Sequence, residues 1–177
     1  VSLNVIRSAR PLVIGAMTQD WDGPVVVLTA QIKRAYNISE QLPVWTESDD
    51  NGASIYGYAE PTSQFYERVP WVDSVLRNRM ETLAALMDDE TEGKQQPIVV
   101  SSARALMQRT IPVNQFRRAS MQLKVGQRWS LEKLLAQWVM MGYEASPIVI
   151  EPGMFSRRGG VVDIFPVAMN APVRLDF

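Results

Sequence analysis

The sequence predicts an α/β fold followed by a smaller α+β unit, and three observations support this assignment. Short runs of β-branched residues at 23–30 and 98–100 are each followed by a helical pattern, as in the βαβ units of a parallel sheet. Residues 71–89 carry the clearest helical periodicity of the chain. From about residue 119 the strand patterns are short and separated by glycine and proline turns, which is typical of antiparallel strands. We therefore expect one domain at residues 1–118 and a second at residues 119–177.

In the first half of the first domain, the sequence predicts three strands and a helix. Residues 10–17 contain a short apolar run that indicates a buried strand turning at Gly15. Residues 23–30 include three consecutive valines, which predicts a strand buried on both faces. A polar helix is expected near 31–36, and a third strand at 42–46.

The second half of this domain predicts a loop, a long helix, a strand and a short helix. Residues 47–57 are rich in Asp, Asn, Ser and Gly and indicate a loop. In the helix at 71–89, apolar residues recur every three or four positions: Val72, Val75, Leu76, Met80, Leu83, Leu86 and Met87. After the strand at 98–100, Ser101 and Ser102 are expected to cap a short helix that turns Ala105 and Leu106 inward.

The sequence of the second domain predicts one helix among several strands. Residues 121–125 alternate as a strand does, and Ser130 is the expected N-cap of a helix that ends at Gly142. The strands that follow are expected at 146–150, 154–156, 161–165 and 173–177, with turns at 152–153, 159–160 and 166–172.

Composition excludes several classes of chemistry. The chain has 177 residues, no cysteine and no histidine, which rules out disulfides, thiol nucleophiles and a histidine base. The formal net charge of −1 disfavours a domain dominated by nucleic-acid binding. No apolar run has the length of a membrane span, and no secretion signal is visible. The chain does not begin with Met and stops inside a strand pattern at Phe177, so we expect a piece of a longer protein.

Three stretches that invite a catalytic interpretation are better explained by structure. The segment around Gly15 has one glycine and no P-loop lysine, so nucleotide binding there is not expected. The carboxylates at 88–92, like those at 49–50, lie in polar stretches typical of solvated loops, although paired carboxylates can do acid–base chemistry. Ser101 and Ser102 lack the glycines and the base of a nucleophile elbow.

Residues 56–71 are rich in aromatic side chains and contain Arg68. Aromatic rings interleaved with a basic residue can stack on bases. Because Glu60 and Glu67 cancel the positive charge, we favour packing of this segment onto the sheet.

The stretch "FSRRGG" places Arg157 and Arg158 just before Gly159 and Gly160, at a predicted hairpin turn. Adjacent strand residues point to opposite faces, so each surface of the hairpin receives one arginine. Arginine is favoured in protein interfaces because its planar fork makes paired bonds to carboxylates. An ordinary exposed hairpin and an interaction site are both compatible with this pattern.

The stretch "EPGMFSRRGGVVDIFP…APVRLDF" resembles a segment shared by UvrB and the bacterial transcription-repair coupling factors. Its matching residues include Phe155, Arg158, Gly159, the run Val162 to Pro166, and Arg174. The stretches "FYERVPWVDSVLRNRMETLAAL", "IVVSSARALMQRTIP" and "LKVGQRWSLEKLLAQWVMMGYE" follow the family's order, so the resemblance covers about 13–177. UvrB keeps a Walker A sequence, whereas the N-terminal module of the coupling factors has lost it, so the missing P-loop favours the coupling factors.

The resemblance implies a specific fold and function. Residues 1–118 would be similar to domain 1a of UvrB, a degenerate P-loop, helicase-like α/β domain without a Walker A motif. Residues 119–177 would be similar to its domain 2, a small α+β domain that binds UvrA. The family's UvrA-binding surface uses arginines and an aromatic residue near the hairpin, which implies Arg158 and Phe165, with Gly159 and Gly160 shaping the turn. Arg157 stands where the family is less uniform, and a second family arginine has no match, because Glu144 and Ala145 occupy its region.

The sequence therefore leads to two functional hypotheses. The first is a non-catalytic, cytoplasmic bacterial module that recruits UvrA to stalled RNA polymerase and needs no cofactor itself. In the full-length family member, ATP, magnesium, RNA polymerase and double-stranded DNA would bind later domains, which act as an ATP-dependent translocase. The second hypothesis is a piece of a UvrB-like repair helicase that still binds nucleotide or DNA.

Overall fold

The computed structural model describes residues 2–19, 21–46, 54–61, 70–87 and 96–177. The chain forms two compact units, Val1–Thr110 and Ile111–Phe177. The boundary lies eight residues before the division expected at 118, so helix α5 (Val113–Ala119) belongs to the second unit.

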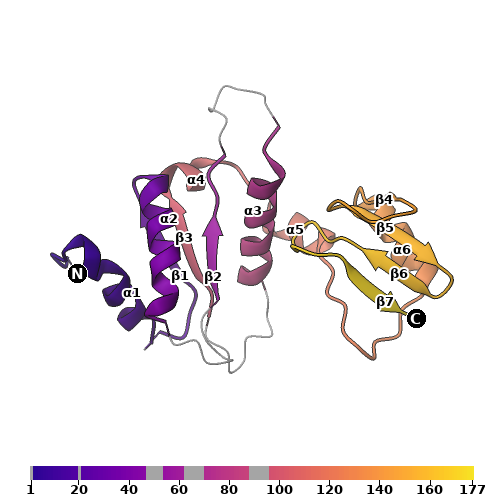
Figure 1. Cartoon of the computed structure of the whole chain (residues 1–177), viewed down its shortest axis with the longest axis horizontal. Helices are drawn as coiled ribbons and strands as arrows, with labels where there is room; N and C mark the ends of the chain where they lie inside the picture. Colours follow the sequence, from indigo (N-terminus) through magenta and orange to yellow (C-terminus); the bar gives the residue numbers. More distant parts are fainter. Residues whose placement is uncertain (1, 20, 47–53, 62–69, 88–95) are drawn as a thin grey trace. The chain divides into compact units, whose positions relative to one another are not determined.

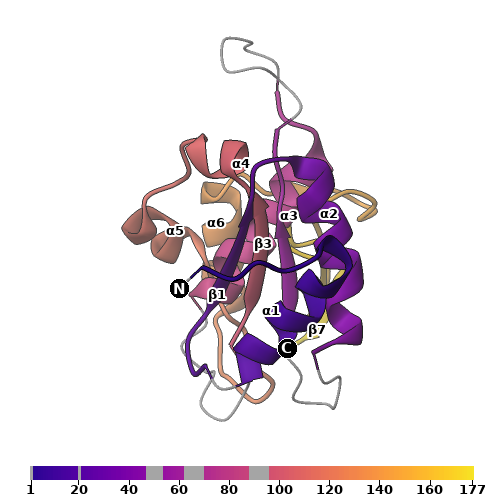
Figure 2. The same ribbon diagram turned by 90° about the vertical axis from the view of Figure 1, so that its left-hand side faces the viewer.

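The first unit is built on a parallel sheet of three strands, β1 (Val25–Thr29), β2 (Ile55–Tyr58) and β3 (Ile98–Ser102). Their order is β1-β3-β2, and the strands run side by side in Figures 1 and 2. Every residue of β3 is buried, because this strand has a neighbour on each edge and a helix on each face. The expected parallel sheet with helices is confirmed.

Two helices cover the two faces of this sheet. Helix α2 (Ile32–Gln41) contributes Ala35 to a core cluster with Ile98 and Val100. Helix α3 (Asp73–Leu86) lies over the other face, where Leu83 packs against the cluster that contains Val99. Both helices were expected, α3 because of its apolar periodicity. A short helix, α4 (Ala103–Met107), follows β3.

The expected strand at 10–17 is wrong, because these residues lie in helix α1 (Arg10–Gln19), preceded by the short 3-10 helix η1 (Arg7–Ala9). Pro11, Gly15 and Thr18 are its buried residues, and their spacing of four and three is that of one helix face. Proline is tolerated in the first turn of a helix because the amide it lacks has no helical partner there. The short apolar run thus belongs to a helix that leaves Leu12 and Met17 exposed, and not to a buried strand.

The expected strand at 42–46 is also wrong, because this segment continues from α2 into the 3-10 helix η2 (Leu42–Val44). Leu42 is completely buried, and its carbonyl accepts hydrogen bonds from the amides of Trp45 and Thr46. In contrast, β2 begins at Ile55, within the stretch expected to be a loop. Residues 47–53 of that stretch lie outside the described part of the chain.

Strand β1 is not buried on both faces as its valines suggested. The side chains of Val26 and Leu28 are each 54% exposed, whereas Val25 and Val27 pack against the core cluster with α2. The reason is the strand order, since β1 lies at the edge of the described sheet and α3 packs over β2 and β3.

The second unit is a four-stranded sheet covered on one face by helix α6 (Leu131–Met140). Its strands are β4 (Glu144–Ala145), β5 (Met154–Arg158), β6 (Val161–Ile164) and β7 (Val173–Asp176), in the order β4-β5-β6-β7. The pairs β5–β6 and β6–β7 are antiparallel as expected, but β4 and β5 are parallel, so the sheet is mixed.

The core of the second unit joins α6 to the inner face of this sheet. Leu134 and Trp138 of α6 pack against Phe155, Val162 and Ile164. The rings of Trp138 and Phe155 meet edge to face, with 5.7 Å between their centroids. The helix ends as predicted at Gly142, whose φ of 91° is a left-handed value that favours glycine.

Two further expected strands are absent from the described structure. Residues 121–125 form no strand, although Met121 and Leu123 do pack against the core, which explains their alternation. Residues 146–150 form an irregular segment instead of a strand, after the two-residue strand β4. Alternation therefore indicated which residues turn inward but not whether a partner strand was available.

Candidate functional site

The hairpin between β5 and β6 has a two-residue loop, Gly159–Gly160. Gly159 has a φ of 65°, which is the left-handed value required at the first central position of a type II′ turn. Gly160 is needed for a different reason: a Cβ there would lie 3.2 Å from the carbonyl oxygen of Phe177. Both glycines therefore shape the turn and the close approach of β7, as the sequence predicted for a hairpin.

The two arginines before the turn lie on opposite faces of the sheet, as alternation predicted. Arg157 is paired with Val162 on the face that packs against α6, but it lies beyond the core and is exposed. Its Nε donates a hydrogen bond to the carbonyl oxygen of Gly159 at 3.2 Å. Arg158 lies on the outer face, which it shares with Ser156 and Asp163. The structure thus separates Arg157 from Arg158.

Arg158 lies beside the irregular segment 147–150. Its Nη2 donates to the carbonyl oxygen of Pro147 at 3.3 Å, and the hydroxyl of Ser156 donates to the same oxygen at 3.2 Å. These two bonds attach the segment to the outer face of β5. Residues of this segment, β6 and β7 line a hollow of ≈ 430 Å³. The cationic side chain of Arg158 also lines it.

Opposite Arg158, the hollow is lined by a pair of charged residues on adjacent strands. Arg174 of β7 donates from Nε and Nη2 to the two carboxylate oxygens of Asp163, at 2.7 and 2.9 Å. This bidentate hydrogen bonding is the largest influence on the Asp163 carboxyl and lowers its pKa; burial opposes it, and the charges of Arg174 and then Arg158 add smaller lowering effects. Asp163 therefore remains ionised, and Arg158 keeps its fork largely available, since its one described bond is to a backbone carbonyl.

Phe165 follows the last residue of β6 and extends the ladder by one step. Its amide donates to the carbonyl oxygen of Met154 at 2.9 Å. By alternation from Ile164, which is in the core, Phe165 lies on the outer face, and its side chain is half-buried. It is not among the residues that line the hollow beside Arg158. Arg158 and Phe165 share a face, but no described contact brings them together.

Two residues of this surface were in the matching sequence pattern but were not singled out as functional. Asp163 and Arg174 alternate with Val162, Ile164, Val173 and Leu175 in the strand patterns. Polar residues at alternating positions of two paired strands share one face, which is the signal that places them opposite each other. Glu144 and Ala145, at the position of the unmatched family arginine, form the exposed strand β4.

The other sequence motifs have structural roles in the described residues. The hydroxyl of Ser102 accepts a hydrogen bond from the amide of Ala105 at 3.1 Å, which confirms it as the N-cap of α4. Ser101 is not a cap, because it lies within β3 and donates to the carbonyl oxygen of Tyr58. Tyr58 is buried as the packing hypothesis required, whereas residues 62–69 and the acidic stretch at 88–92 lie outside the described part of the chain.

The described ranges contain no group of three or more acidic, cysteine or histidine side chains placed to hold a metal ion. In the same ranges, no helix combines the length and the apolar character that crossing a bilayer requires.

Comparisons with known proteins find similarities to a domain family and to several longer proteins. Residues 121–177 match the family model described as the UvrB interaction domain. The chain is 28% identical over 170 residues to the transcription-repair-coupling factor of Bacillus subtilis, and 31% identical over 172 residues to that of Staphylococcus aureus; each alignment covers 96% of this chain and 14% of the relative. It is 37% identical over 86 residues to that of Myxococcus xanthus, which covers 49% of this chain and 7% of the relative. The chain thus spans only about a seventh of these relatives. The chain is thus similar along most of its length to the transcription-repair-coupling factors, and its residues 121–177 match the UvrB interaction domain family.

Proposed function

We propose that this chain is a protein-interaction module that recruits UvrA in nucleotide excision repair, and that it hydrolyses no ATP. The match of residues 121–177 to the UvrB interaction domain supports this role, because these residues include the whole β5–β6 hairpin. The similarity to coupling factors across 96% of the chain supports a setting in transcription-coupled repair.

The observation that carries the proposal is the position of Arg158. This side chain is exposed on the outer face of the sheet and bonds the first residue of segment 147–150, in which Ile148 (65%) and Ile150 (67%) are themselves exposed. An arginine beside exposed apolar groups is the composition typical of an interface centre. Carboxylates of UvrA would bind Arg158 through its free donors, while apolar groups of UvrA would cover Ile148 and Ile150.

The fixed charges around Arg158 favour this arrangement. Asp163 is already neutralised by the bidentate bond from Arg174, so Arg158 is not required to pair with it. A partner that brings a carboxylate therefore gains a new charge-assisted bond without breaking an existing one. Phe165 would add an aromatic contact on the same face.

The wider setting rests on the same proposal. A coupling factor of full length would bring UvrA to RNA polymerase stalled at a lesion, in the bacterial cytoplasm. ATP and magnesium would be used by other domains, which act on double-stranded DNA. The lack of a P-loop lysine in 10–23 supports the view that this chain itself does not contribute to that ATPase activity.

Calorimetric titration of purified UvrA with the whole 177-residue chain tests the proposal. The proposal requires saturable binding that weakens as salt is added, because a charged contact is screened. A chain that gives no heat and no co-migration with UvrA at low salt would contradict the recruiting role.

A further inference from the structure

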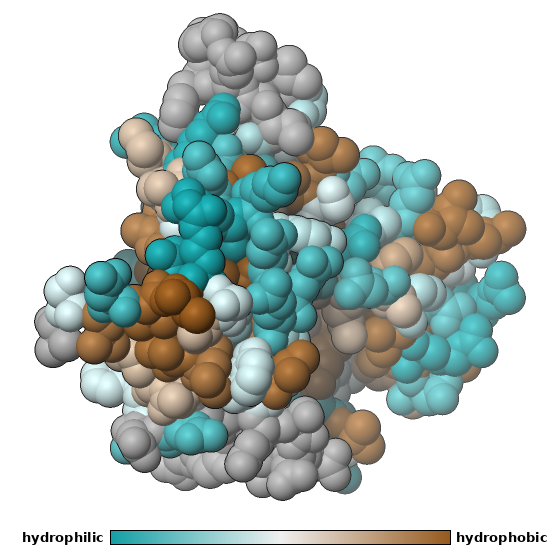
Figure 3. All heavy atoms as spheres, turned by 60° about the vertical axis from the view of Figure 1, so that its left-hand side comes forward, coloured by the Kyte–Doolittle hydropathy of each residue, from teal (hydrophilic) through white to brown (hydrophobic). Residues whose placement is uncertain are grey.

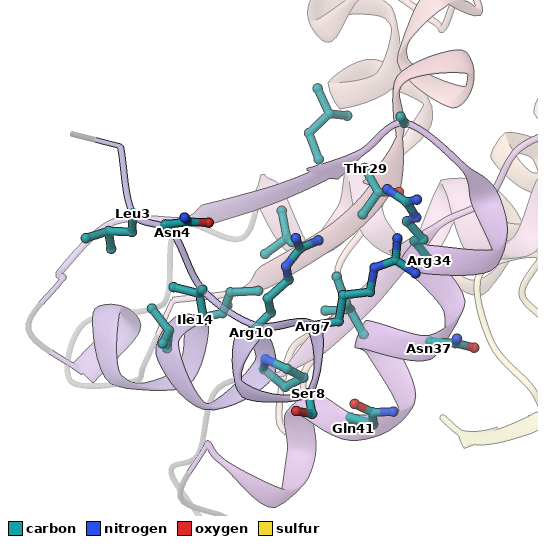
Figure 4. A pocket seen from close by; sticks show the side chains of 17 residues that line it. Leu3, Asn4, Arg7, Ser8, Arg10, Ile14, Thr29, Arg34, Asn37 and Gln41 are labelled. Atoms are coloured by element: carbon teal, nitrogen blue, oxygen red, sulfur yellow. The ribbon is translucent and has the colours of Figure 1, made fainter.

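The first unit contains a second surface feature, a pocket of ≈ 720 Å³ formed by residues from four elements and from the segment before them. One wall is formed by η1 and α1, the opposite wall by α2, and the floor by the carboxyl end of β1 (Figure 4). On this side of the unit, hydrophilic residues lie next to a hydrophobic area (Figure 3). The carboxyl ends of parallel strands are where open α/β sheets bind ligands.

Three arginines line this pocket: Arg7 of η1, Arg10 of α1 and Arg34 of α2. Arg7 and Arg10 are three residues apart along the first wall, and Arg34 lies in the first turn of α2 on the opposite wall. Figure 4 shows the guanidinium groups of Arg7 and Arg34 directed toward each other, with that of Arg10 directed to the same side of the pocket. The cationic groups therefore converge from two walls.

Nothing in the described lining neutralises these charges. The residues that line the pocket include no Asp and no Glu; the other polar side chains are uncharged, among them Asn4, Asn37 and Gln41. None of the three arginines has an ion pair with a described carboxylate, in contrast to Arg104 and Arg174, which pair with Glu60 and Asp163. Convergent cations without counter-charges repel each other, and an anion placed between them removes this repulsion.

We propose that this pocket binds a phosphate group, presented by a small phosphorylated molecule. Planar guanidinium groups bind phosphate oxygens through paired charge-assisted hydrogen bonds, and two walls that face each other can donate to one phosphate from two sides. The amide groups of Asn4 and Asn37 supply further donors. The pocket lies in Val1–Thr110, so this site does not depend on the UvrA surface in Ile111–Phe177.

The lining also argues against two other anions. It contains no Trp, Tyr or Phe, so there is no aromatic surface on which a nucleobase can stack. The lining contains no cation besides these three arginines, whereas a nucleic-acid strand presents one phosphate after another. Recognition would therefore be of the phosphate group itself, and it requires no glycine-rich loop.

Calorimetric titration of the whole chain at low salt tests this inference, with pyrophosphate, inorganic phosphate, ADP and a short single-stranded oligonucleotide as probes. We expect saturable 1:1 binding of pyrophosphate, with ADP within about threefold of it because the nucleoside adds no contact. The double variant Arg7→Gln with Arg34→Gln should weaken pyrophosphate binding by roughly tenfold or more, since it removes charge-assisted bonds from both walls. The matched control, Arg117→Gln with Arg118→Gln, removes two exposed charges from α5 and should bind as the original chain does.

Thermal unfolding separates a ligand site from a structural role. Without phosphate, the Arg7→Gln/Arg34→Gln variant should unfold at the same or a higher temperature, because repulsion is removed; with phosphate, only the original chain and the control should gain stability. A lower unfolding temperature without phosphate, or equal loss of binding in the control, would overturn the proposal. Binding of ADP or of the oligonucleotide more than about tenfold tighter than pyrophosphate would also overturn it, and would indicate a nucleotide or nucleic-acid site instead.

Discussion

Arg174 and Asp163 form a bidentate ion pair across β6 and β7, with N–O distances of 2.7 and 2.9 Å. The pair occupies the outer face of the sheet, next to Arg158. The pair joins the two strands on this face. Arg158 differs from Arg174, because its one described side-chain hydrogen bond is to a backbone carbonyl. The pKa of Asp163 therefore reports whether its pairing with Arg174 persists in solution.

The first prediction concerns the pKa of Asp163. Hydrogen bonding from Arg174 is the largest cause of its lowered pKa, and the charge of Arg158 is a smaller one. Arg174→Gln should therefore raise the pKa of Asp163 more than Arg158→Gln does. Carboxyl chemical shifts followed by NMR during an acid titration measure both values.

The sign of the stability effect follows from the direction of this shift. A carboxyl with a lowered pKa in the folded state contributes stability above its ordinary pKa of 3.8, and that contribution is lost as pH falls through the lowered value. The Arg174→Gln variant should lack this loss on acidification. Titration of Asp163 at or above 3.8 in the original chain would show that the pair does not persist in solution.

The second prediction concerns the core of the second unit. Leu134 and Met140 lie on the same helix, but Leu134 is fully buried and Met140 is 88% exposed. Leu134→Ala should lower the free energy of unfolding by about 2–5 kcal/mol, because it leaves a cavity beside Trp138 and Phe155. Met140→Ala should change it by less than about 0.5 kcal/mol. Denaturant unfolding curves measure the free energy of unfolding of both variants. Similar effects of the two changes would show that α6 does not turn Leu134 inward as described.

The third prediction concerns the hairpin turn. Gly159→Ala forces an L side chain into the left-handed region and should cost about 1 kcal/mol or more. Gly57 is the matched case, because its backbone is not left-handed and a Cβ there has open space around it. Gly57→Ala should be neutral or slightly stabilising. If Gly159→Ala proves as harmless as Gly57→Ala in thermal unfolding, the turn is not the one described.

The fourth prediction concerns Arg79 of α3, which is 1% exposed. Its guanidinium lies 4.0 Å from the ring centroid of Tyr58, and Nη1 donates to the carbonyl oxygens of Ala59 and Ala105. Burial lowers the pKa of Arg79, although an arginine remains charged at neutral pH. Arg79→Ala should cost about 2–4 kcal/mol through lost packing and lost bonds to two carbonyls.

Two further variants separate the contributions of Arg79. Arg79→Met restores the volume without the charge, so it should be less destabilising than Arg79→Ala, particularly because Nη2 has no partner among the described residues. Arg118→Ala, on the exposed side of α5, is the control and should be close to neutral. Equal stability of the Ala variants at 79 and 118 would contradict the buried position of Arg79.

The elements that sequence patterns predicted well are those in which local signals and packing agree. Helix α6 has an apolar face containing Leu134 and Trp138, and Gly142 after it, although Ser130 at its N-cap position makes no side-chain capping hydrogen bond. The hairpin at 154–164 has alternation on both strands and a glycine pair between them. The apolar run at 98–100 predicted a strand, and the structure places β3 between two neighbours.

The elements that sequence patterns missed depend on the tertiary environment. The apolar residues of 10–17 suit a strand as well as a helix, and their packing against η2 decides between them; the carbonyl oxygen of Trp45 would lie 2.6 Å from a Cβ at Gly15. In residues 121–125, apolar and polar side chains alternate because Met121 and Leu123 pack against the core that contains Leu134 and Trp138. No strand pairing among the described residues is involved. In α3, the periodicity identified the helix but not its two buried residues, Arg79 and Thr82, because charged and polar side chains carry no hydrophobic signal.

The candidate site was predictable in part for the same reason. The glycine pair and the two arginines are local features, and alternation assigned Arg157 and Arg158 to different faces before the structure did. The hollow beside Arg158 was not predictable, because it requires the irregular segment 147–150 and the pairing of Asp163 with Arg174.

The opposite orientation of Arg157 and Arg158 provides the sharpest test of the recruiting role. Both residues are exposed, adjacent in sequence and identical in charge, so each is a matched control for the other. We propose that UvrA binds the outer face, so that Arg158→Glu should weaken binding by roughly tenfold or more, whereas Arg157→Glu should have a clearly smaller effect.

The measurement is a calorimetric titration of UvrA with the original chain and with each charge-reversed variant, after unfolding curves have shown that both variants fold. If UvrA binds the outer face, we expect a large loss of affinity for Arg158→Glu and a small one for Arg157→Glu. Unchanged affinity for Arg158→Glu, or a larger loss for Arg157→Glu, would contradict it.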